Sequence, residues 1–139
     1  MSDIRDGLTA PDCLVAIMVA ISASDERLPT TELVTIERLV NHLPVFKGYD
    51  QGRIPEVSGL IFDLLSQEDG LDALFKLLRK HLPARLNETA YALCCDVSAA
   101  DGTLYENEIR LLLAIRDELE IDRLHAAAIE RGARVRHLT

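Results

Sequence analysis

One segment of this chain occurs twice, and the repeat constrains the fold more than any other feature. Residues 21–33 (ISASDERLPTTEL) align with residues 97–109 (VSAADGTLYENEI), with the same residue at five of thirteen positions. In each copy an apolar run ends and an amphipathic run begins, so the repeat describes a helix–loop–helix unit used twice. Two such units predict a core of four helices related by a pseudo-twofold axis.

The apolar spacing is helical along almost the whole chain. Apolar residues recur at intervals of three and four, as in Leu33, Ile36 and Val40, and proline or glycine falls between the runs. The predicted helices cover 11–25, 30–43, 53–67, 70–81, 84–100, 106–119 and 122–133. We therefore expect an all-α, single-domain bundle of about seven helices over residues 1–139. Its repeat copies lie around 11–43 and 84–119, with 53–81 as an insertion that closes one side.

Charge and hydropathy exclude two classes of function. The net charge of −8 repels nucleic acid, and the arginines 131, 134 and 136 are interpreted as a solvated helix end. The longest apolar stretch, residues 13–21, is far shorter than the roughly 20 residues that cross a bilayer. Asp3 and Asp6 precede any apolar run, which is untypical of an export signal. We expect a cytoplasmic protein that is not transmembrane.

The three cysteines favour a reduced environment over a disulfide scaffold, because an odd number cannot pair completely. Cys94 and Cys95 are neighbours in a predicted buried helix, so their thiols point about 100° apart. They are interpreted as two small core residues, with a redox- or tellurium-reactive vicinal pair as the alternative. No spacing of serine, histidine and acidic residues matches a catalytic constellation, and we expect no enzyme.

The acidic residues of the repeat are the candidate site. Asp25 and Asp101 end a predicted helix, where negative charge opposes the helix dipole, and Glu32 and Glu108 fall in the first turn of the next helix. If the two loops lie side by side, these four carboxylates converge, and Asp96 adds a fifth from the second copy. Such a set suits Ca²⁺ or another divalent cation. The alternatives are that the residues cap helices and loops without metal, or bind a basic partner.

The two motifs ASDERLPTTE (23–32) and AADGTLYENE (99–108) resemble the tellurite-resistance TerB-like family. The second copy has the family pattern aDG-x-L-x-x-x-E, whereas the first has Glu26 in place of the glycine. Similarity to the short free-standing bacterial members also lies in residues 4–12, 43–46 and 124–133. The resemblance implies an all-helical fold with internal pseudo-symmetry, in which Asp25, Glu32, Asp101 and Glu108 are the family's acidic residues.

The same resemblance implies a link to tellurite and chemical-stress responses in bacteria, through membrane-bound and calcium-binding partners. We therefore expect a cytoplasmic helical adaptor whose paired acidic loops bind a divalent cation or a partner protein. The alternative is a metal-independent protein–protein interaction module that recruits its partner through an apolar groove. A homodimer is compatible with an acidic bundle of this size, but no residue decides it.

Overall fold

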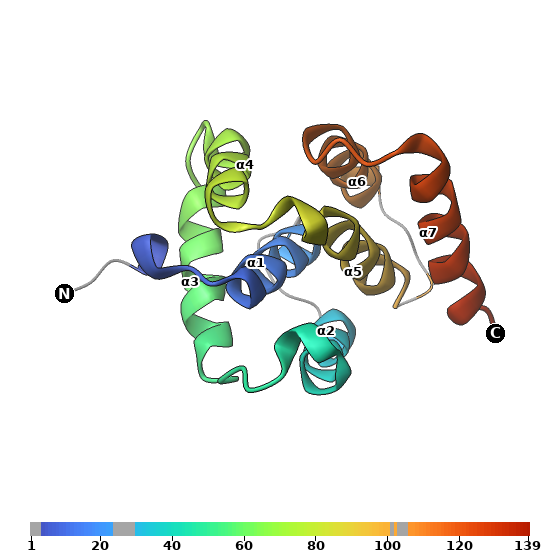
Figure 1. Cartoon of the computed structure of the whole chain (residues 1–139), viewed down its shortest axis with the longest axis horizontal. Helices are drawn as coiled ribbons and strands as arrows, with labels where there is room; N and C mark the ends of the chain where they lie inside the picture. The colour runs from blue at the N-terminus through green and yellow to red at the C-terminus, as the bar shows by residue number, and fades with distance from the viewer. Residues whose placement is uncertain (1–3, 24–29, 101, 103–105) are drawn as a thin grey trace.

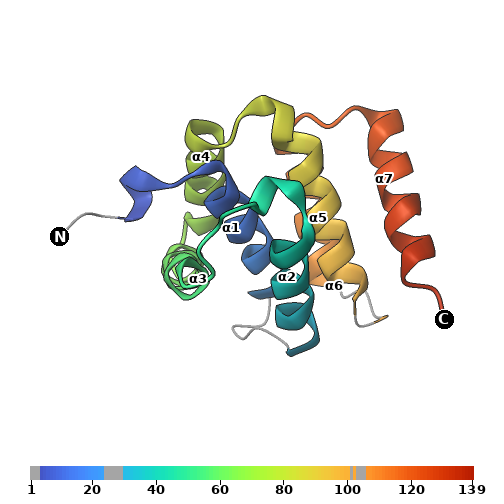
Figure 2. The same cartoon turned by 60° about the horizontal axis from the view of Figure 1, so that its bottom comes forward.

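Two apolar helices form the centre of the molecule. The structure is a computed structural model that describes residues 4–23, 30–100, 102 and 106–139. Helix α1 (Ala10–Ser22) is buried from Asp12 to Ser22, and it packs against α5 (Asn87–Ala99). Figures 1 and 2 both place α5 between α1 and the C-terminal helix α7 (Arg123–Arg136). A helix that is apolar on every face needs neighbours all round, which the remaining helices provide.

The other helices surround this pair. Helices α3 (Arg53–Leu65) and α4 (Gly70–His81) cover one side of α1, and α6 (Glu106–Glu118) contacts both central helices. Helix α2 (Thr30–His42) also packs against both. Among the described segments, a short 3₁₀ helix, Ile4–Gly7, precedes α1, and two more, Pro44–Phe46 and Ala84–Leu86, lie in the connections after α2 and α4.

The all-α fold class predicted from the sequence is confirmed, because the described residues form seven α-helices and no strand. Each helix lies within a few residues of its predicted range. The segment 84–86, predicted as α-helix, is instead a 3₁₀ turn that leads into α5. The end of the first predicted helix, residues 24–25, lies outside the described residues.

The packed helix pairs follow a twofold pattern. Helix α1 packs against α3, and α5 packs against α7. Likewise, α2 contacts α5, and α6 contacts α1. Exchanging α1 with α5, α2 with α6 and α3 with α7 therefore turns each of these contacts into another observed contact. By its packing neighbours, α3 is thus similar to α7. The assignment of residues 53–81 to an insertion stays a prediction. Helix α4 has no counterpart among the described helices.

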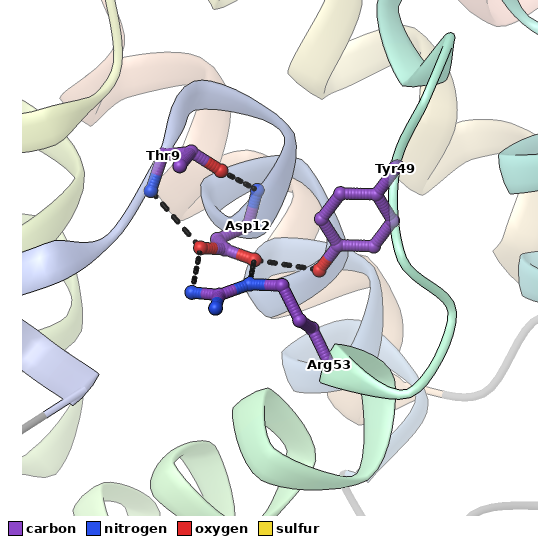
Figure 3. Close-up of polar contacts among 4 residues, drawn as sticks. All are labelled: Thr9, Asp12, Tyr49 and Arg53. Atoms are coloured by element: carbon purple, nitrogen blue, oxygen red, sulfur yellow. Dashed lines mark hydrogen bonds and ion pairs between the residues drawn. The ribbon is translucent and has the colours of Figure 1, made fainter.

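A buried carboxylate anchors the beginning of α1. Thr9 and Asp12 form a capping box, in which the Thr9 hydroxyl accepts from the Asp12 amide and the Asp12 carboxylate accepts from the Thr9 amide. Arg53, the first residue of α3, donates twice to Asp12, at 2.6 and 3.0 Å, and the Tyr49 hydroxyl donates at 2.6 Å (Figure 3). The cluster fixes α1, α3 and the loop before α3 to one another.

The second half carries a weaker version of this anchor. Glu88, which aligns with Asp12 in the repeat register, lies 3.1 Å from the Nδ1 atom of His125 in the first turn of α7. The two contacts thus join equivalent helices, α1 with α3 and α5 with α7. Because both side chains of the second pair are more than half exposed, solvent screens it and we expect it to add little stability.

The Asp12 cluster makes stability depend on pH. Burial alone would raise the pKa of Asp12, but hydrogen bonds from Arg53, Thr9 and Tyr49 and the Arg53 charge lower it to about 2. A carboxyl group whose pKa is lower in the folded state stabilises above its unfolded pKa of about 3.9, and this contribution is lost as the pH falls towards 2.

Replacing Asp12 by Asn should therefore cost about 2–4 kcal/mol of unfolding free energy at pH 7, because it removes the buried partner of Arg53. The cost should shrink at about pH 2.5, where wild-type Asp12 is itself becoming protonated. Denaturant unfolding at both pH values measures the difference, with the exposed Asp63→Asn on α3 as control. An equal cost of Asp12→Asn at both pH values would show that the charge of Asp12 does not stabilise the fold.

Candidate functional site

The structure describes three of the five predicted acidic site residues. Glu32 and Glu108 are each the third residue of their helix, α2 and α6, and each is only 2% exposed. Their equivalent positions and equal burial follow the repeat. Asp25 and Asp101 lie outside the described residues, so their convergence stays a prediction. Gly102, which follows α5, has the left-handed backbone conformation (φ +78°) that glycine adopts without a Cβ penalty.

Asp96, the fifth predicted ligand, is engaged in a different contact. Its carboxylate accepts from Arg136 of α7 at 2.6 Å and lies 3.6 Å from the Nε2 atom of His137. Its side chain is 15% exposed. In the described part of the chain, no group of three or more His, Cys, Asp or Glu side chains could hold a metal ion. Asp96 therefore joins α5 to α7 in this structure.

The cysteines lie in the core as protonated thiols. Cys94 is fully buried, and its thiol lies 3.7 Å from the Ile17 carbonyl oxygen, across the contact between α5 and α1. Burial raises the pKa of Cys94 well above its ordinary value. Burial also raises the pKa of Cys13 and of Cys95 to about 12. All three cysteines are free.

A pocket that the sequence analysis did not find lies between α5, α6 and α7. Its volume is about 440 Å³, within the range of small-molecule sites. In Figure 1, α6 lies above α5 and α7 lies to its right. The residues that line it come from α5 and its end, from α6, and from α7 and its end: Tyr91, Cys95, Ser98, Ala99, Gly102, Ile109, Leu112, Leu113, Arg116, Glu130, Ala133, Arg134, His137 and Leu138.

The direction of the helices defines the two ends of this pocket. Three side-chain contacts between α5 and α7, at residues 88 and 125, 91 and 130, and 96 and 136, show that these two helices run in the same direction. The hydrogen bond that the Asn87 side chain donates to the Leu119 carbonyl oxygen places the end of α6 beside the start of α5. One pocket end thus lies near the start of α5 and the other near its end, with α5 as the floor. The floor residues Tyr91, Cys95 and Ser98 are buried, at 1–6% exposure.

A polar triad closes the first end. The Tyr91 hydroxyl donates to Glu130 at 2.7 Å, and Arg116 of α6 donates to the same carboxylate oxygen at 3.3 Å. Burial and the hydrogen bond to Glu130 raise the pKa of Tyr91, so this phenol is a neutral donor. The triad joins α5, α6 and α7 by their side chains.

The walls are apolar and partly open to solvent. Ile109 and Leu113 of α6 are 40% and 46% exposed, and Leu138 after α7 is 67% exposed. A second hollow, of about 740 Å³, lies between α1, the α3–α4 connection and α6, but its polar lining residues are all exposed: Ser66, Gln67, Glu68, Asn107 and Arg110. The α5–α6–α7 pocket, with its buried polar floor, is the better-formed site.

Sequence patterns could have indicated only part of this pocket. The α5 residues Tyr91, Cys95 and Ser98 follow helical spacing, but in sequence such a stripe is indistinguishable from a core face. Helices α6 and α7 leave this face of α5 partly uncovered, and that depends on how the two helices pack. The Thr9-x-x-Asp12 capping box, in contrast, was readable from the sequence.

No protein-family model, curated protein or solved structure matches this chain. Among the described residues, no helix is both long enough and apolar enough to span a bilayer. What the protein does is therefore inferred from its own residues.

The buried thiols should be unreactive in the folded protein. With a pKa near 12, roughly one thiol in ten thousand is ionised at pH 8, against a substantial fraction in an unfolded chain. Ellman's reagent at pH 8 should therefore label the folded protein at least 100-fold more slowly than the protein in concentrated guanidinium chloride. Rapid labelling of Cys94 or Cys95 in the folded protein would instead support the reactive vicinal pair.

Proposed function

We propose that this protein works by binding, as a small helical adaptor, and that the α5–α6–α7 pocket receives an apolar group of its ligand. The observation that carries the proposal is the pocket itself, which combines a buried floor with half-exposed apolar walls at Ile109 and Leu113. Exposed apolar side chains gathered around a cavity are typical of binding sites, whereas isolated ones are common on any surface. This role corresponds to the metal-independent module expected as an alternative from the sequence.

The physiological setting follows from sequence resemblance alone. We place the protein in the cytoplasm, as a TerB-like adaptor of a tellurite or chemical-stress response, with a protein partner at a membrane. The resemblance supports this setting through the two acidic motifs around Glu32 and Glu108. The protonated thiols of Cys94 and Cys95 favour a binding role over thiolate chemistry on tellurite.

A neutral apolar dye tests the pocket. N-phenyl-1-naphthylamine should bind saturably with enhanced fluorescence, and Leu113→Ser should weaken the binding about tenfold by removing part of one wall. Val34→Ser on α2 is the matched control, because Val34 is 45% exposed and Leu113 46%, while Val34 lies outside the pocket. Equal affinity in both variants, or no saturable binding, would contradict the proposal.

A divalent-cation site is the second candidate function. It is favoured by the burial of Glu32 and Glu108 at equivalent positions of two helices, since glutamate is rarely buried without specific interactions. Carboxylates of these first turns, together with Asp25 and Asp101 of the preceding segments, would supply oxygen ligands for Ca²⁺. The capping interpretation places the same carboxylates on backbone amides, without a metal.

Millimolar Ca²⁺ or Mn²⁺ should raise the melting temperature of the wild type if the cation site exists, because a ligand that binds only the folded state stabilises it. Glu108→Gln should abolish the shift. Glu106→Gln should retain it, since the Glu106 side chain is 77% exposed on the same helical turn. A melting temperature that changes with neither cation nor with EDTA would exclude the cation site and support the capping interpretation.

A further inference from the structure

Two serines at the same position of the repeat differ in their hydrogen bonding. Ser22 near the end of α1 donates to the Met18 carbonyl oxygen at 2.9 Å. Ser98, its counterpart in α5, is 1% exposed, and its hydroxyl has no hydrogen-bond partner among the residues that the structure describes. Ser98 lines the α5–α6–α7 pocket. Because a buried hydroxyl without a partner has lost its hydrogen bonds to water, a ligand group that bonds to it gains affinity.

The charges around the pocket leave one cation unmatched. Arg116 is paired with Glu130, and His137 lies beside Asp96. Arg134, which lines the pocket and is exposed, makes no ion pair within the described part of the chain. It belongs to α7, which carries four arginines and one glutamate in a protein of net charge −8. The α7 wall is therefore the part of this acidic surface that attracts an anion.

These two groups define the polar end of the ligand. The Arg134 guanidinium only donates hydrogen bonds, and the Ser98 hydroxyl has its proton available, so the ligand group must accept. A carboxylate has two oxygens that can accept from such donors, and its planar shape matches the fork of an arginine. The apolar walls at Ile109, Leu112 and Leu113 then require a hydrocarbon body.

The burial of the floor decides the size of the ligand. Because Ser98 is 1% exposed, side chains that cover its hydroxyl must shift before a ligand group can bond to it, and a slender group requires the smallest shift. An α-helix with its side chains is about 10–12 Å across, so a partner helix would cover the walls and not contact the floor. The volume of about 440 Å³ also suits a small molecule.

We propose that the pocket binds a small amphiphilic carboxylate, such as a medium-chain fatty acid, with Arg134 and Ser98 at its carboxylate and the apolar walls around its chain. This inference rests on the proposed binding function of the same pocket. The ligand would enter from the open side between Leu113 and Leu138, both of which are exposed.

Calorimetric titration with decanoate and with decan-1-ol tests this inference. Decanoate is kept below its micelle-forming concentration and decan-1-ol below its solubility limit. Decanoate should bind the wild type about tenfold more tightly than the alcohol. Arg134→Gln should remove this difference, whereas Arg131→Gln, an exposed position of α7 outside the pocket, should retain it. Ser98→Ala should weaken decanoate several-fold and Ser22→Ala should not, with circular dichroism confirming that each variant folds.

Equal binding of the acid and the alcohol, an unaffected Arg134→Gln variant, or no binding of decanoate would each overturn the carboxylate proposal. None of these results alters the dye measurement, in which the neutral probe reports on the apolar walls alone. If the dye binds and is weakened by Leu113→Ser while decanoate fails, the pocket function stands and the ligand class is wrong. If decanoate behaves as expected but is unaffected by Leu113→Ser, the carboxylate site lies apart from the proposed apolar pocket.

Discussion

The contact between α1 and α5 is the constraint on which the rest of the structure depends. From Cys13 to Ile21, α1 exposes no more than 2% of any residue, so every side of this helix must be covered by another element. Helix α5 supplies one side, and the thiol of Cys94 lies against the α1 backbone across that contact. Ala16 and Ala20 of α1 and Ala90 of α5 are small and almost fully buried, so a larger side chain at any of these positions has little room.

The pseudo-twofold arrangement around this contact explains where the two halves differ. In the first half, the buried Asp12 cluster fixes α3 against α1, and α4 covers more of α1. In the second half, the equivalent Glu88–His125 pair is exposed and no described helix corresponds to α4. The pocket lies in this second half, between α6 and α7. Ser22 and Ser98 differ in the same way: Ser22 is bonded to its own helix, whereas Ser98 lines the pocket and has no partner within the described segments.

Burial decides the chemistry of the interior, and an uneven distribution of charge decides that of the surface. The protonated thiols and the neutral Tyr91 phenol belong to the apolar interior, where burial disfavours their charged forms. Net negative charge covers most of the chain, whereas α7 carries an excess of arginine. An apolar pocket bordered by this basic helix can hold a ligand that combines a hydrocarbon body with an anionic group, which the remaining acidic surface would repel.

The sequence by itself determined the helices, because apolar spacing and proline or glycine punctuation act locally. It also determined that Glu32 and Glu108 begin equivalent helices, and that Gly102 follows α5 in a left-handed conformation. Only the tertiary structure decided that Asp96 pairs with Arg136, that Arg53 and Tyr49 meet Asp12, and that α6 and α7 leave a pocket over α5. These contacts join residues about 14 to 41 positions apart, and their geometry is set by helix packing, which short-range sequence patterns do not encode.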